Sequence, residues 1–112
     1  ALVNMTDMLG HAYRHGYAVG AFGVVTLDFL EAIIRAAENY RAPVILNLAE
    51  SHFDYYDFDL LAPAAVAAAR RAKVPVAIHL DHGRSLESAV AFENRGVQLS
   101  HRYLDVHGYA VA

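Results

Sequence analysis

The chain has 112 residues, 56% of them hydrophobic, with a formal net charge of −3, seven histidines and no cysteine. This length and composition fit one modest domain with a buried core, without disulfides, thiolate catalysis or cysteine-ligated zinc. The net negative charge offers no basic patch of the kind that binds nucleic acid. No apolar run approaches the roughly 20 residues that cross a membrane.

The first half of the chain alternates helical and strand patterns. In order, we expect a helix ending near His15, a strand over 17–22, a helix over 27–40 and a strand over 44–49. Asn4 or Thr6 is expected to cap the first helix and Thr26 the second, because these side chains accept hydrogen bonds from free backbone N–H groups. The apolar residues of the second helix recur at helical spacing.

The second half continues the alternation. After an acidic, aromatic loop over 50–56, we expect an alanine-rich helix over 57–72, a strand over 74–80, a helix over 86–94 and the start of a strand at 97–99. This βαβαβα order predicts a parallel sheet, from either a (β/α)8 barrel or a doubly wound fold. The missing glycine-rich turn argues against dinucleotide binding. A complete barrel needs about 250 residues, so only part of one is expected.

The third predicted strand ends in His79, Leu80, Asp81, His82 and Gly83. In parallel α/β sheets, active sites lie at the carboxyl ends of the strands. Because side chains alternate along a strand, His79 and Asp81 should share one face, and the aliphatic residues between them should meet the helices. A carboxylate beside an imidazole at such an end suits proton transfer next to a metal ion.

Four segments together resemble the amino-terminal third of one enzyme family: 8–9 (ML), 16–22 (GYAVGAF), 42–45 (APVI) and 75–83 (PVAIHLDHG). The family is the class II aldolases, which are zinc-dependent and act on fructose- or tagatose-bisphosphate. The resemblance runs from about residue 2 to 90. Each segment alone is weak, whereas HLDHG behind GYAVGAF is quite specific.

The resemblance implies an α/β fold built from the first three βα units of a (β/α)8 barrel, in a cytoplasmic homo-oligomer. It implies zinc-dependent, reversible cleavage of a ketose 1,6-bisphosphate, a small-molecule sugar phosphate, to dihydroxyacetone phosphate and glyceraldehyde 3-phosphate. Asp81 matches the family's acid/base and His82 its first zinc ligand. No nucleic-acid or membrane partner is expected.

Two positions depart from the family pattern. Gly23 stands where the family commonly has Asn, and Ala49 stands where it commonly has Ser. Both family side chains hydrogen-bond substrate, so each loss is expected to cost about 1–3 kcal/mol of binding. Residues 1–91 form the expected barrel part and 92–112 a divergent, irregular tail. In that tail, HGYAV at 107–111 repeats residues 15–19.

These departures leave other functions open. Two zinc histidines and the phosphate loops of the family have no match, so we expect little or no activity from the chain alone. The alternatives are a non-catalytic barrel fragment that self-associates through its strand edges and a small-molecule or metal-binding half-barrel.

Several residues have a competing structural interpretation. His79 is expected to be a hydrogen-bonded interior residue, and the remaining histidines are expected at the surface. His101 and His107 are disfavoured as additional zinc ligands. Residues 55–58 can form a substrate lid or subunit contact, or simply pack on the helix that follows.

Overall fold

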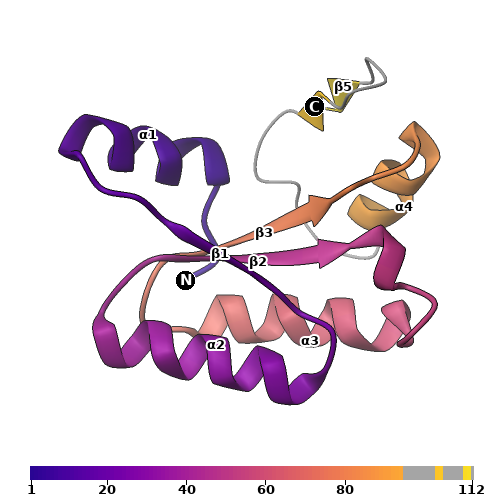
Figure 1. The fold of residues 1–112 in the computed structure, drawn as a ribbon, viewed down its shortest axis with the longest axis horizontal. Helices are drawn as coiled ribbons and strands as arrows, with labels where there is room; N and C mark the ends of the chain where they lie inside the picture. Colours follow the sequence, from indigo (N-terminus) through magenta and orange to yellow (C-terminus); the bar gives the residue numbers. More distant parts are fainter. Residues whose placement is uncertain (95–102, 105–109, 112) are drawn as a thin grey trace.

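Three parallel strands form the sheet around which the chain folds (Figure 1). They are β1 (Gly20–Gly23), β2 (Val44–Ala49) and β3 (Val76–Asp81), hydrogen-bonded in the order β1-β2-β3. The computed structural model describes residues 1–94, 103–104 and 110–111, with side chains as far as residue 92. Each strand is followed by a helix, so the predicted parallel α/β arrangement is confirmed.

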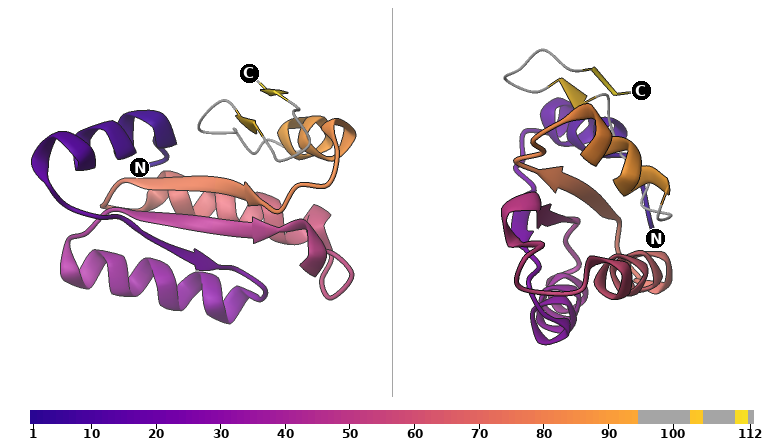
Figure 2. Two further views of the ribbon diagram at one scale, coloured as in Figure 1. Left: turned by 45° about the horizontal axis from the view of Figure 1, so that its top comes forward. Right: turned by 90° about the vertical axis from the view of Figure 1, so that its right-hand side faces the viewer.

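The helices cover both faces of this sheet. They are α1 (Met5–His15), α2 (Leu27–Tyr40), α3 (Phe58–Arg71) and α4 (Leu86–Asn94), with a short 3-10 turn, η1 (Glu50–His52), after β2. Figure 2 shows α1 on one side of the sheet and α2 and α3 on the other. None of the described helices is long and apolar enough to cross a membrane.

Alternation along the strands divides the core in two. Leu46, Ile78 and Leu80 point toward α2 and α3 and are at most 1% exposed within the main cluster. Ile45 and Ala77 point the other way and pack with the methionines of α1, Met5 and Met8. The expectation that the aliphatic face of the third strand meets the helices is confirmed. The opposite face is covered by α1 over its amino-terminal part.

Side-chain caps fix where the helices begin. Of the two candidate caps of α1, Asn4 has this role: its Oδ1 accepts hydrogen bonds from the Thr6 N–H at 2.8 Å and the Asp7 N–H at 3.4 Å. Thr26 caps α2 as predicted, accepting from the Phe29 N–H at 3.2 Å. These contacts satisfy donors that have no partner inside the helix.

Strand boundaries differ from expectation in two places. β1 begins at Gly20 rather than at 17, because Gly16 is left-handed (φ 70°) and the Tyr17 N–H bonds back to the Ala12 carbonyl at the end of α1. β3 begins at Val76 rather than at 74, directly after Pro75, which has no N–H to donate to a ladder.

The tail contains a short antiparallel pair that was not expected. β4 (Tyr103–Leu104) pairs with β5 (Ala110–Val111). The strand expected to start at 97–99 lies outside the described residues. The repeated pentapeptide has two local structures, since Ala110 and Val111 form β5 whereas Ala18 and Val19 precede β1 without regular structure.

Candidate active site

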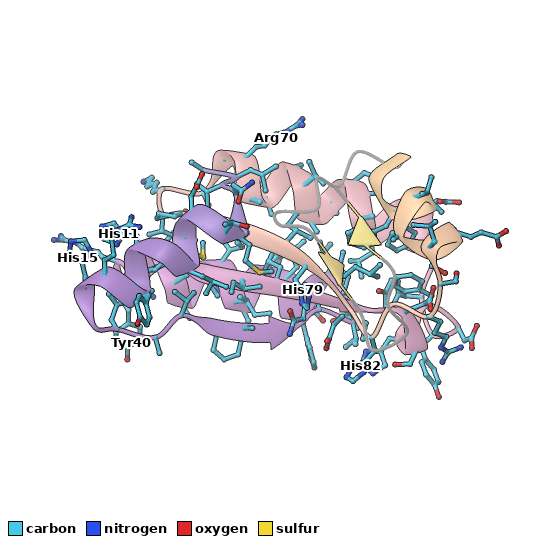
Figure 3. All side chains as sticks on the ribbon, turned by 90° about the horizontal axis from the view of Figure 1, so that it is seen from above. His11, His15, Tyr40, Arg70, His79 and His82 are labelled. Atoms are coloured by element: carbon cyan, nitrogen blue, oxygen red, sulfur yellow. The ribbon has the colours of Figure 1, made fainter. Side chains whose placement is uncertain are left out.

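Asp81 is the last residue of β3, and His82, labelled in Figure 3, follows it with its side chain close to that of Asp81. The Asp81 side chain is 34% exposed and that of His82 is 80% exposed. His82 Nε2 lies 3.8 Å from Asp81 Oδ1, which exceeds hydrogen-bond length. The two groups are therefore neighbours without being tied to each other, and both reach solvent.

The backbone at His82 is left-handed, with φ of 52°. Among the described non-glycine residues, only Arg41 shares this property. A non-glycine residue in this region stores strain, and such residues concentrate at functional sites. The turn also ends the strand, so that the imidazole projects from a loop rather than from the sheet.

The strand register places the predicted positions together. Ala49 of β2 is level with Asp81 of β3, while Gly23, Asn47 and His79 are level with one another one row earlier. All five lie on the sheet face that also carries Ile45 and Ala77, because side chains two apart share a face. We call this face the inner face. The site residues thus occupy the carboxyl-terminal part of the inner face.

His79 is held within this face. Its Nδ1 lies 3.1 Å from Asn47 Oδ1, which accepts the ring N–H, and its side chain is half-buried. The expected hydrogen bond of His79 is present, and the side chain is half-buried rather than fully interior. Asn47 was not singled out from the sequence, although it is the polar residue of an otherwise apolar strand, VILNLA.

Gly23 and Ala49 present almost no side chain to the site. A Cβ at Gly23 would meet no atom within 4 Å, and its backbone has no positive φ. Ala49 is 7% exposed and stands next to Asp81 in register. Larger polar side chains are therefore compatible with the backbone at Gly23, and the inner face is thinly filled here.

Glu50 and Arg84 connect the two loops that border the site. The Arg84 N–H donates to Glu50 Oε2 at 2.7 Å, and Arg84 Nε lies 3.8 Å from the same oxygen. The Glu50 side chain is 11% exposed. Sequence reasoning missed this pair. The available signal was position, since Glu50 directly follows the end of β2 and Arg84 follows the HLDHG segment.

The residues present fit a metal ion only in part. An imidazole nitrogen is a suitable zinc ligand, and His82 presents one beside a carboxylate. Catalytic zinc sites use three protein ligands. Within the part of the chain that the structure describes, no group of three or more His, Cys, Asp or Glu residues is arranged to hold an ion. The site therefore offers one candidate ligand, not a complete set.

Of the other histidines, two lie on α1, one lies in the turn after β2, and two lie outside the described residues. His11 and His15 are exposed on α1, at the opposite end of the molecule from His82 (Figure 3). His52 belongs to η1 and is half-buried, with no hydrogen-bond partner for its buried Nδ1 among the described residues. His101 and His107 fall outside the described residues.

The aromatic loop after η1 packs against the core. The rings of Phe53 and Phe58 stack at 4.4 Å, and Phe58 stacks on Phe92 of α4 at 5.4 Å. Tyr56 packs with them, and burial raises the pKa of its phenol from 10.0 to about 12. Tyr55 is 83% exposed. The packing interpretation therefore holds for Tyr56 and Phe58.

Comparisons with known sequences match this chain to one enzyme family. The model of the family described as fructose-bisphosphate aldolase class-II matches residues 3–101, about ten residues further than the motifs alone indicate. A probable fructose-bisphosphate aldolase of Bacillus subtilis is 47% identical over 90 residues, covering 78% of this chain and 32% of the relative. A fructose-bisphosphate aldolase of Thermus caldophilus is 45% identical over 89 residues, covering 80% and 29%.

Other relatives and solved structures widen the comparison. A 6-phospho-5-dehydro-2-deoxy-D-gluconate aldolase of Bacillus licheniformis is 40% identical over 90 residues, covering 78% of this chain and 31% of the relative. The crystal structure of the YdjI aldolase of Escherichia coli K12 matches with a TM-score of 0.84 at 30% identity, covering 87% of this chain and 38% of that one.

A putative fructose-1,6-biphosphate aldolase of Coccidioides immitis matches with a TM-score of 0.67 at 39% identity, covering 73% of this chain and 31% of that one. The chain thus spans about a third of the length of the relatives it matches. Its three strands and their helices correspond to part of the barrel of these aldolases. The chain belongs to the class II fructose-bisphosphate aldolase family.

Proposed function

We propose that this chain supplies Asp81 as the proton-transfer group and His82 as one zinc ligand for aldol chemistry. The reaction is the reversible cleavage of a ketose 1,6-bisphosphate to dihydroxyacetone phosphate and glyceraldehyde 3-phosphate. One observation carries the proposal: a partly exposed carboxylate and an exposed imidazole stand together at the carboxyl end of β3, on the inner face. The names of the relatives support the substrate class.

Asp81 suits the proton transfer that this cleavage requires. As the carbon–carbon bond breaks, the hydroxyl that becomes the aldehyde oxygen must lose its proton, and the bonding electrons move toward the ketone oxygen. A carboxylate oxygen of Asp81 accepts that proton and returns it in the condensation direction. The carboxylate is 34% exposed, so a substrate hydroxyl can reach it from the solvent side.

His82 suits a ligand role because its ring projects beyond the end of the sheet. A divalent ion bound there supplies Lewis-acid stabilisation of negative charge on the ketone oxygen. Since no group of three or more candidate ligands is arranged to hold an ion among the described residues, the further ligands would come from other parts of the barrel. For that reason, we expect the 112-residue chain alone to give little or no cleavage, even with added zinc.

An activity assay of the isolated chain tests the expectation that it gives little or no cleavage. Cleavage is measured by coupling triose phosphate release to a dehydrogenase, with and without Zn2+. Turnover at the rate of a complete family enzyme would show that the site needs no further ligands, and this part of the proposal would then be wrong.

A chimera tests the residues themselves. Residues 3–91 of this chain replace the matching segment of the Bacillus subtilis relative, to which the chain is 47% identical over 90 residues. In an active chimera, Asp81→Asn is expected to lower kcat by about 10²–10⁴-fold, as for the loss of a general acid/base. Asp54→Asn is the matched control, because Asp54 is an exposed carboxylate on the loop after η1.

His82→Ala in the same chimera separates metal binding from proton transfer. This variant is expected to lose bound zinc, measured by elemental analysis, whereas Asp81→Asn keeps it. Retention of stoichiometric zinc by His82→Ala would remove His82 from the ligand set. Full kcat in Asp81→Asn would remove Asp81 from the proton transfer.

A further inference from the structure

A pair of histidines, His11 and His15, lies on α1 at the end of the molecule away from His82 (Figure 3). His11 and His15 are four residues apart in α1, so they share one face of the helix. Their rings stack with centroids 4.0 Å apart and planes 17° apart, and both residues are exposed. Two imidazoles are therefore held in contact at the surface, outside the candidate active site.

Hydrogen bonds orient both rings through Nδ1. His15 Nδ1 lies 2.9 Å from the backbone carbonyl oxygen of His11. A carbonyl only accepts, so Nδ1 carries the proton and the Nε2 of neutral His15 carries a lone pair. His11 Nδ1 lies 2.7 Å from the hydroxyl oxygen of Tyr17. Where that oxygen accepts the hydrogen bond, Nδ1 of His11 carries the proton and its Nε2 carries the lone pair. Metal-ligating histidines are typically oriented by such a bond from the other ring nitrogen.

We propose that Nε2 of His11 and Nε2 of His15 together bind one divalent cation of the class that imidazole prefers, such as Zn2+, Ni2+ or Cu2+. Zinc–nitrogen bonds of about 2.0–2.1 Å in a tetrahedron place two ligand nitrogens roughly 3.3 Å apart. The ring centroids are 4.0 Å apart, which is close to that spacing. The stacked rings must turn out of their near-parallel arrangement for both Nε2 lone pairs to point at one ion, and both side chains are exposed and free of the core. Water completes the coordination.

The ion would link the last two turns of α1. α1 ends at His15, and Gly16 then turns the chain through a left-handed conformation toward β1. Through Tyr17, the pair also contacts the segment that leads into β1. Binding to the folded state alone stabilises a protein by an amount that grows with the logarithm of ligand concentration over Kd. Thermal unfolding is therefore a second readout, independent of any aldolase activity.

The test titrates Zn2+ alone into the 112-residue chain carrying His82→Ala, which removes the proposed ligand at the other end. Calorimetry is expected to show one ion per chain and zinc is expected to raise the midpoint of thermal unfolding. His11→Ala or His15→Ala in this background is expected to abolish both effects. Binding that survives either substitution unchanged would overturn the proposal.

A matched control keeps the number of histidines constant. Tyr13→His combined with His15→Ala moves the second imidazole to a position that does not face His11, and Tyr13 is 89% exposed, so the fold should tolerate it. This double variant is expected to lose saturable binding, whereas equal binding would mean that histidine content alone is responsible. Tyr17→Phe is expected to weaken binding by up to about tenfold; unchanged affinity would remove Tyr17 from its orienting role.

Discussion

His82 combines a strained backbone with an exposed side chain. Left-handed geometry costs a non-glycine residue about 1–2 kcal/mol relative to glycine, which has no Cβ to clash. We therefore expect His82→Gly to raise the free energy of unfolding by about 1 kcal/mol, measured by urea denaturation. Arg41→Gly is the matched control, since Arg41 has φ of 51° and lies at the end of α2.

The two variants separate stability from site chemistry. Both are expected to gain stability, but only His82→Gly removes the proposed ligand. A loss of stability in both variants would show that these left-handed residues make favourable contacts that outweigh the strain.

Tyr56 gives the fold a dependence on alkaline pH. Its hydroxyl is buried without a hydrogen-bond partner among the described residues, and its pKa is raised to about 12. Between pH 10 and 12, the unfolded chain releases this proton while the folded chain keeps it, so the free energy of unfolding should fall with rising pH. Tyr56→Phe is expected to reduce this fall and to leave stability at pH 7 unchanged or slightly higher.

Tyr55→Phe serves as the comparison for Tyr56→Phe, because Tyr55 is 83% exposed in the same loop. Thermal unfolding at pH 7, 10 and 11 measures all three proteins. An equal change of slope in both variants would mean that burial of Tyr56 is not the cause.

At the level of single residues, the sequence predicted those site residues that can be recognised from their immediate neighbours in the chain. Asp81 and His82 were found because they end an apolar run, and their geometry is now described, while their roles stay predictions. The hydrogen bond from His79 to Asn47 and the contact from Arg84 to Glu50 join residues 32 and 34 positions apart. Such pairs depend on strand register and loop paths, which a single sequence does not specify.

For the helices, capping makes a sharp prediction. Asn4→Ala is expected to lower the free energy of unfolding by about 1 kcal/mol, because it removes the side-chain acceptor for the first N–H groups of α1. Thr6→Ala changes the other residue that the sequence offered as a cap and is expected to cost less. Chemical denaturation measures the free energy of unfolding of both variants. A larger loss for Thr6→Ala than for Asn4→Ala would contradict the assignment of Asn4 as the cap.

The elements were predicted well where a periodic pattern was long and bounded. α2, β2 and α4 have the expected limits, and α3 differs by one residue at each end. The start of β1 was wrong, because residues 17–19 have strand-like composition but follow a helix end that uses the Tyr17 N–H. β4 and β5 have two residues each, too few to show alternation, and their pairing depends on the path between them.

At the scale of the whole molecule, the outer edge of β1 is unpaired among the described residues. Beside it, a largely apolar groove of about 590 Å³ lies between β1 and α2, lined by residues that include Tyr17, Phe22 and Tyr40. Phe22 is 52% exposed. Unpaired edges and apolar surface favour association, so we expect the isolated chain to self-associate as its concentration rises.

Light scattering over a concentration series measures this association. Phe22→Lys is expected to shift the chain toward the monomer, because a lysine at an edge opposes strand pairing. Tyr13→Lys adds the same charge on α1, away from β1, and is expected to leave association unchanged. A chain that stays monomeric throughout would contradict the expectation of a homo-oligomer for this polypeptide.

The packing of α1 on the inner face separates the two ends of the molecule. Met5 and Met8 pack against Ile45 and Ala77 on the amino-terminal part of this face, between the two ends. Under the proposed function, a sugar phosphate would reach Asp81 past the carboxyl ends of the strands and leave by the same route. A cation captured by His11 and His15 would have to return to bulk water before it could serve His82.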